Sequence, residues 1–144
     1  MTVKRKLLWI LIIAMFAFIW IHSMMPPDVS SDESGAALDF LKPFLEIFVG
    51  KGNVTEHLVR KLGHFSEYFA LGTLLTIALR DYPVTFLRIV GIALLTSFID
   101  ETIQIFSGRG PAIVDMWIDI AGASLGCIIV LIIHKLIVLG TVVK

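Results

Sequence analysis

Cysteine is nearly absent from the chain, and neither sign of charge is in excess. Cys127 is the single cysteine among 144 residues, so an intrachain disulfide and a zinc site built from several cysteines are both excluded. The 12 Lys and Arg residues balance the 12 Asp and Glu residues, which gives a formal net charge of zero. Nucleic-acid binders carry an excess of basic residues that neutralise phosphates, so this composition argues against that class.

Apolar side chains, by contrast, make up 57% of the residues. Soluble domains contain about 45–50%, so the excess indicates surface that faces lipid. A helix needs about 20 apolar residues to cross roughly 30 Å of hydrocarbon, and four segments come close to that length. We therefore expect an all-α membrane protein with a single domain over residues 1–144. Its predicted transmembrane helices are residues 7–25, 62–80, 84–106 and 115–139.

The first apolar segment follows Lys4, Arg5 and Lys6, as the core of a cleaved signal peptide would. No small-x-small cleavage site comes after it, which favours a retained membrane anchor.

Basic residues near the spans predict the orientation, because cytoplasmic flanks retain Lys and Arg during insertion. With both termini in the cytoplasm, seven basic residues lie inside (4, 5, 6, 80, 88, 135 and 144) and five lie outside (42, 51, 60, 61 and 109). On this arrangement eleven of the 12 acids are on the outer side, and Asp81 is the exception. We expect the polar site to face outward.

The longest connection, residues 26–61, is predicted to be an outer loop. It opens with Pro26-Pro27 and a polar stretch over residues 30–35, both typical of irregular structure. Apolar residues at helical spacing over residues 38–48 predict an amphipathic segment in the outer interface, divided at Pro43. Asn53, with Glu56 three residues later, resembles a capping box that starts the second span.

Ionisable and polar side chains gather at the outer ends of the last three predicted spans. Helical spacing places those of the second span on one face, and ionisable groups at membrane depth are costly unless they are paired, hydrated or face a cavity. We therefore expect a polar site between the helices. The candidate catalytic residues are His64, Glu67, Asp100 and Glu101, and the candidate substrate-binding residues are Arg60, Tyr68, Gln104, Arg109, Asp115 and Asp119.

The fourth span indicates which way its acids point. Asp115 and Asp119 are four residues apart, and their stripe continues through Gly122 and Gly126. A Gly-x-x-x-Gly pair lets another helix backbone approach closely, so this stripe is expected to face the bundle rather than lipid.

The acids of the set outnumber its cations, which leaves several explanations open. An ion-pair network would hold the helices together, whereas surplus carboxylate favours a bound cation, a shared proton or a hydroxyl-rich ligand. His64 and Glu67 could both contact one Mg²⁺, Mn²⁺ or Ca²⁺ ion, but no HExxH-type signature is present, so the cofactor stays open. Arg109 could neutralise Asp115 or bind an anionic head group.

Two classes of function fit these residues. An enzyme would use Asp100 or Glu101 as general base or metal ligand, with His64 as its acid/base partner. A noncatalytic binder would use the polar site for a head group and residues 38–48 for an apolar tail. Ion transport is disfavoured because the inner halves of the spans lack a chain of ionisable residues.

Three motifs together resemble the VanZ-like family of bacterial membrane proteins. They are Arg60-Lys61-x-x-His64-Phe65-x-Glu67-Tyr68-x-x-Leu71-Gly72, Asp100-Glu101-x-x-Gln104-x-Phe106-x-x-Arg109, and Asp115-x-x-x-Asp119-x-x-Gly122-x-x-x-Gly126. Asp119 departs from the pattern, since many members have Asn there. The resemblance implies a four-helix protein of the bacterial cytoplasmic membrane, linked to low-level resistance to teicoplanin-type glycopeptides. A lipid-linked cell-envelope intermediate or the glycopeptide itself would then be its partner.

Overall fold

The computed structural model describes residues 2–110 and 112–142, which form five helices and no strand. The helices are α1 (Val3–Ser23), α2 (Pro27–Val49), α3 (Glu56–Leu79), α4 (Thr85–Phe106) and α5 (Ile113–Val142). Pro111 and Lys144, which entered the sequence predictions, lie outside the described residues. The all-α prediction is confirmed.

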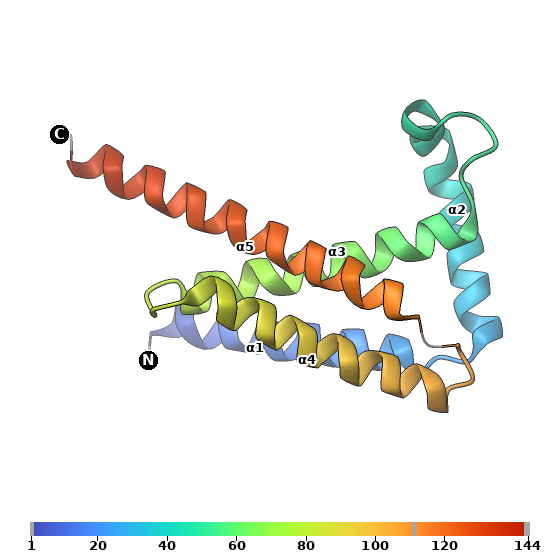
Figure 1. The fold of residues 1–144 in the computed structure, drawn as a ribbon, viewed down its shortest axis with the longest axis horizontal. Coiled ribbons are helices and arrows are strands. Elements are labelled where there is room, and N and C mark those ends of the chain that lie inside the picture. The colour runs from blue at the N-terminus through green and yellow to red at the C-terminus, as the bar shows by residue number, and fades with distance from the viewer. Residues whose placement is uncertain (1, 111, 143–144) are drawn as a thin grey trace.

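Four of the helices, α1, α3, α4 and α5, are long and apolar enough to cross a membrane. They run back and forth along the molecule, whereas α2 stands across one end of them (Figure 1). The start of α1, the α3–α4 turn and the end of α5 all lie at the opposite end. The prediction of a membrane protein with four spans is confirmed.

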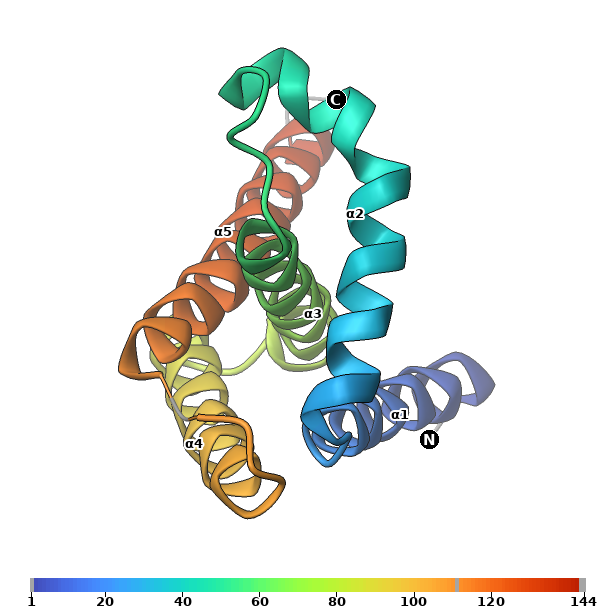
Figure 2. The same cartoon turned by 90° about the vertical axis from the view of Figure 1, so that its right-hand side faces the viewer.

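Helix α2 overturns the prediction of irregular structure at the start of residues 26–61. Its 23 residues form one helix, so the polar stretch 30–35 is helical and Pro43 does not divide it. Pro27 occupies the first turn, where the missing N–H is not needed. Leu38, Leu41 and Leu45 share a half-buried stripe, and α2 contacts α3. Figure 2 looks onto this end of the bundle, with α2 in front.

The start of α3 also differs from the prediction. Its N-cap is Thr55, whose side-chain oxygen accepts the backbone N–H of Leu58 at 3.2 Å. Asn53 does not cap α3 but donates its amide to the carbonyl of Val49 at 2.7 Å. The capping-box prediction is therefore wrong: the N-cap lies two residues later than predicted, and its N3 residue, Leu58, has no side-chain acceptor to complete a box.

The tightest packing joins α3 to α5. A Cβ atom added at Gly122 would lie 2.4 Å from the carbonyl oxygen of Phe65, and one at Gly126 would lie 2.5 Å from that of Phe69. In the other direction, a Cβ at Gly72 would lie 2.3 Å from the carbonyl oxygen of Ala123. The predicted close approach at the glycine stripe is confirmed, and its partner is α3. Cys127 is fully buried in the same core as a packing residue.

Candidate functional site

Three buried side chains from three helices meet near the α2 end of the bundle. His64 of α3 places its Nδ1 atom 3.4 Å from Oδ1 of Asp119 on α5 and 3.8 Å from Oδ2 of Asp100 on α4. Asp100 and Asp119 are fully buried, and His64 is 6% exposed. We call His64, Asp100 and Asp119 the buried triad. Sequence analysis had placed all three at this end of the molecule, and the structure brings them into one cluster.

Neighbouring polar groups hold each carboxylate of the buried triad. Ser97 donates its hydroxyl to Oδ2 of Asp119 at 2.6 Å. Ser23, the last residue of α1, donates its hydroxyl to Oδ1 of Asp100, and Gln104 donates its amide to Oδ2 of Asp100 at 3.3 Å. The two acids are thereby oriented by groups from α1 and α4.

Two atoms of the buried triad have no hydrogen-bond partner. They are Nδ1 of His64 and Oδ1 of Asp119, which face each other. A buried polar atom without a partner is costly, and a direct N–H···O bond between these atoms would have a length of about 2.7–3.2 Å. The three side chains of the triad therefore lie close together but form no hydrogen bonds with one another.

Glu67 pairs with His22 rather than with a member of the buried triad. One of its carboxylate oxygens lies 3.0 Å from Nδ1 of His22 on α1, and Nε2 of the same imidazole lies 3.3 Å from the carboxylate of Glu33 on α2. The sharing of one ion by His64 and Glu67, considered from their spacing, is not the arrangement found. Glu67 instead belongs to a link between α1, α2 and α3.

Glu101 and Asp115 lie where α4 turns into α5. One carboxylate oxygen of Glu101 accepts the backbone N–H of Ala112 at 2.7 Å, while its other oxygen is buried without a partner. Asp115 is 9% exposed, and its Oδ1 is also without a partner. Both residues carry an oxygen that a ligand or water could engage.

Arg109 ties this turn to the end of α1. Its guanidinium donates to the carbonyl oxygen of His22 at 3.1 Å, and no ion pair joins it to Asp115 in the described parts of the chain. Burial, followed by the nearby charge of Arg60, lowers the pKa of Arg109 below its ordinary value. Of the two roles predicted for Arg109, neutralising Asp115 is therefore not found.

Four polar contributors to this end of the molecule were not among the candidate site residues: Ser23, Ser97, His22 and Glu33. Ser97 was detectable, since it precedes Asp100 by three residues and so shares its face of α4. The other three come from α1 and α2, and nothing in local spacing shows that these helices meet α3 and α4 here.

The family model for VanZ/LLP1 matches residues 8–134, which includes every candidate site residue. The chain belongs to the VanZ/LLP1 family. No curated protein and no solved structure matched it.

Two pockets, each of about 280 Å³, give access to the polar end of this VanZ/LLP1 protein. Arg60 and Arg109 line both of them. The pocket beside α2 also contains His22 and Glu33, and the pocket beside the α4–α5 turn also contains Gln104 and Asp115. Tyr68 differs from these residues because it is fully buried in the core, with its hydroxyl unpartnered.

An apolar groove of about 480 Å³ runs between α1 and α4. It reaches Trp20 and Ile99, and Ile99 directly precedes Asp100. Its lining is almost entirely apolar: Ile13, Phe16, Ala17, Trp20, Ile92, Leu95, Thr96 and Ile99. The groove therefore extends to the residue that precedes Asp100 of the buried triad.

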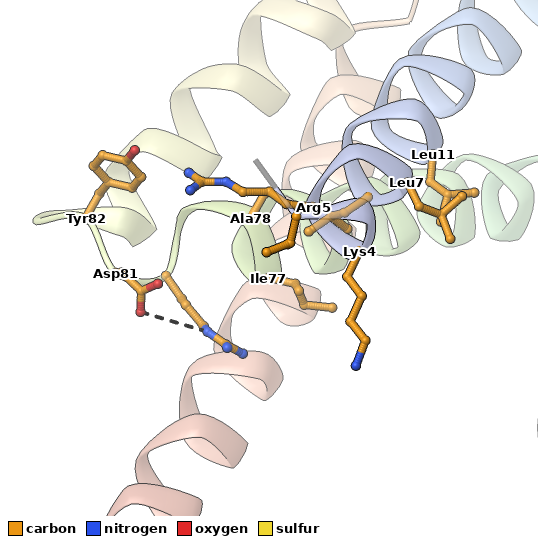
Figure 3. A pocket seen from close by; sticks show the side chains of 11 residues that line it. Lys4, Arg5, Leu7, Leu11, Ile77, Ala78, Asp81 and Tyr82 are labelled. Carbon is orange, nitrogen blue, oxygen red and sulfur yellow. Dashed lines mark ion pairs between the residues drawn. The ribbon is translucent and has the colours of Figure 1, made fainter.

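The opposite end of the VanZ/LLP1 bundle is basic rather than acidic. A pocket of about 840 Å³ lies there between the start of α1 and the end of α3. Figure 3 shows Lys4 and Arg5 beside Ile77 and Ala78, with Asp81 in the turn that follows. The carboxylate of Asp81 lies 4.0 Å from Nε of Arg80. Basic and acidic groups are thus separated along the membrane helices.

Proposed function

We propose that this VanZ/LLP1 protein acts at the outer face of the bacterial cytoplasmic membrane on a lipid-linked cell-envelope component, and thereby lowers susceptibility to teicoplanin-type glycopeptides. One observation carries the proposal: two pockets lined by Arg60 and Arg109 lie at the same end of the bundle as the buried acids, and an apolar groove extends to Ile99, next to Asp100. Such a site offers separate surroundings for the head group and the tail of a lipid.

The head group would enter by the pockets that Arg60 and Arg109 line. A guanidinium binds phosphate or carboxylate through two parallel hydrogen bonds, so two arginines suit an anionic head group. In the catalytic form of the proposal, His64 and Asp100 either supply acid/base chemistry themselves or hold a metal ion that activates water. The unpartnered oxygen of Glu101 supports a role for it as general base, because that oxygen is free to accept a proton.

The apolar tail has two candidate surfaces. The groove between α1 and α4 reaches Ile99, next to Asp100, so a tail in the groove would leave the head group near the buried triad. Helix α2 adds exposed aromatic side chains at Phe40, Phe44 and Phe48. The rings of Phe44 and Phe48 pack with their centroids 5.2 Å apart. A bulky glycopeptide or a long lipid could contact this face of α2.

The separation of charge supports the outward orientation. Lys4, Arg5 and Arg80 gather at one end of the bundle, and basic residues favour the cytoplasmic side. The buried triad lies toward the other end, beneath α2, which would then face the outside.

The second form of the proposal is a noncatalytic binder that shields an envelope lipid or captures a lipophilic antibiotic. The exposed phenylalanines of α2 favour it, since turnover requires no such surface. It requires stoichiometric binding without chemical change. Arg109→Ala and Phe44→Ser with Phe48→Ser would weaken that binding.

A lipid-mass experiment tests both forms. Purified protein is incubated with total bacterial envelope lipids, with and without Mg²⁺ and Mn²⁺, and lipid masses are followed by mass spectrometry. The wild type is compared with the double variant Asp100→Asn/Glu101→Gln, and with Asp81→Asn, an acid at the far end, as the control. A mass change with wild type and control alone supports the enzyme. A lipid that copurifies unchanged with the same two proteins supports the binder. If no lipid changes or copurifies, the proposal is wrong.

A further inference from the structure

The distances inside the buried triad do not suit direct hydrogen bonds. His64 Nδ1 is 3.4 Å from one carboxylate and 3.8 Å from the other, whereas charge-assisted N–H···O bonds close to about 2.7–2.9 Å. Each member of the triad offers one ligand atom, and these atoms lie within 4.8 Å of one another. Atoms this close together can all reach a single metal ion at bond lengths of about 2.0–2.3 Å after small side-chain adjustments.

Two of the three atoms that such an ion would use have no hydrogen-bond partner, whereas both oxygens of Asp100 accept hydrogen bonds. His64 is 6% exposed and Asp119 is fully buried, yet Nδ1 of the first and Oδ1 of the second lack a partner. The remaining oxygen of Asp119 is occupied by the Ser97 hydroxyl, so Oδ1 is left facing His64. Donors of this kind orient metal-binding carboxylates in proteins.

The balance of charge in the buried triad also favours a bound cation. Two buried carboxylates accompany one imidazole, and in the described residues neither Arg60 nor Arg109 forms an ion pair with Asp100 or Asp119. A divalent cation bound to all three side chains would neutralise both carboxylates and satisfy both unpartnered atoms.

We infer that the buried triad binds one divalent transition-metal ion through His64 Nδ1 and one oxygen each from Asp100 and Asp119. A donor set of one imidazole nitrogen and two carboxylate oxygens suits Zn²⁺ or Mn²⁺, whereas Ca²⁺ takes six to eight oxygens. Three protein ligands leave a coordination position for water or for an oxygen of a ligand. The use of this ion on an envelope lipid rests on the proposed function, but its binding does not.

Metal binding is tested without any lipid. Purified protein is depleted of metal with a chelator in detergent, and Zn²⁺ or Mn²⁺ is titrated in while the bound metal per chain is counted by elemental analysis. We expect one ion per wild-type chain. His64→Gln and Asp119→Asn would each weaken binding by at least tenfold, and the variant with both changes would lose it. Asp81→Asn serves as the control, because this acid lies in the turn between α3 and α4 at the far end of the bundle, and it would keep wild-type affinity.

A second measurement uses only the wild-type protein and so does not depend on whether the variants fold. Zinc X-ray absorption of the loaded wild type would show mixed nitrogen and oxygen ligands with a single imidazole. Wild-type protein that takes up no ion, or an affinity that Asp81→Asn lowers and Asp119→Asn leaves intact, would overturn the inference. Failure of metal binding leaves the lipid-mass experiment unaffected, and a failed lipid experiment with intact metal binding would overturn only the proposed function.

Discussion

Gly122 of α5 lies directly against the backbone of Phe65 on α3, so that a Cβ atom there would stand 2.4 Å from the Phe65 carbonyl oxygen. Phe65 follows His64, and Gly122 comes three residues after Asp119. The close approach of the two backbones therefore sets the separation of His64 from Asp119, and helix packing controls the geometry of the buried triad.

Gly122→Ala is expected to lower stability. The added methyl group must push α3 and α5 apart, and overpacking of this kind costs about 1–3 kcal/mol. Gly91→Ala is the matched control, because Gly91 is also inside a membrane helix but has nothing within 4 Å of an added Cβ. Thermal unfolding in detergent measures both variants, and Gly91→Ala should be neutral or stabilising by about 0.5–1 kcal/mol. Equal effects of the two changes would contradict the packing argument.

Ser97→Ala is expected to destabilise the protein through Asp119. It removes the donor that satisfies Oδ2 of a fully buried carboxylate, and an unsatisfied buried acceptor costs about 1–3 kcal/mol. The control is Thr102→Ala on the same helix, where the lost hydroxyl donates to the carbonyl of Phe98 in its own helix. The thermal unfolding midpoints of the two variants are compared in detergent, and Ser97→Ala should show the larger decrease. A smaller loss for Ser97→Ala than for Thr102→Ala would argue against this role.

Two changes at Glu101 separate a structural role from a chemical one. Glu101 accepts the Ala112 N–H, and glutamine keeps an oxygen that can accept that bond, whereas alanine removes it. We expect Glu101→Ala to increase amide hydrogen exchange at the α4–α5 turn and Glu101→Gln to leave it close to wild type. If Glu101 is also the general base, both variants lose lipid turnover. Full turnover by Glu101→Gln would exclude that role.

Cysteine labelling tests the orientation of the bundle. In a Cys127→Ala background, Ser31→Cys places a thiol on the exposed side of α2, and Thr141→Cys places one near the end of α5. In intact cells, a membrane-impermeant maleimide should label position 31 and reach position 141 only after lysis. The reverse pattern would place the buried triad near the cytoplasmic side and remove the basis for an outward-facing activity.

Properties that depend on local sequence were predictable. The four membrane helices follow from runs of apolar residues, because spanning the bilayer requires only length and hydropathy. Gly122 and Gly126 on the stripe of Asp115 and Asp119 predicted which face of α5 enters the bundle. Helix α2 was predicted only in part, since residues 30–35 and Pro43, where local signals favour irregular structure and a break, lie inside one continuous helix.

Partner choice within the site required the tertiary structure. Spacing along α3 placed His64 and Glu67 on one face, yet His64 turns toward Asp100 and Asp119 while Glu67 turns toward His22. Helical periodicity specifies the direction of a side chain from its own axis but not which other helix stands there. The sequence by itself thus determined the membrane helices and the set of polar residues at one end. Only the packing of α1, α4 and α5 around α3 decided which of those residues meet.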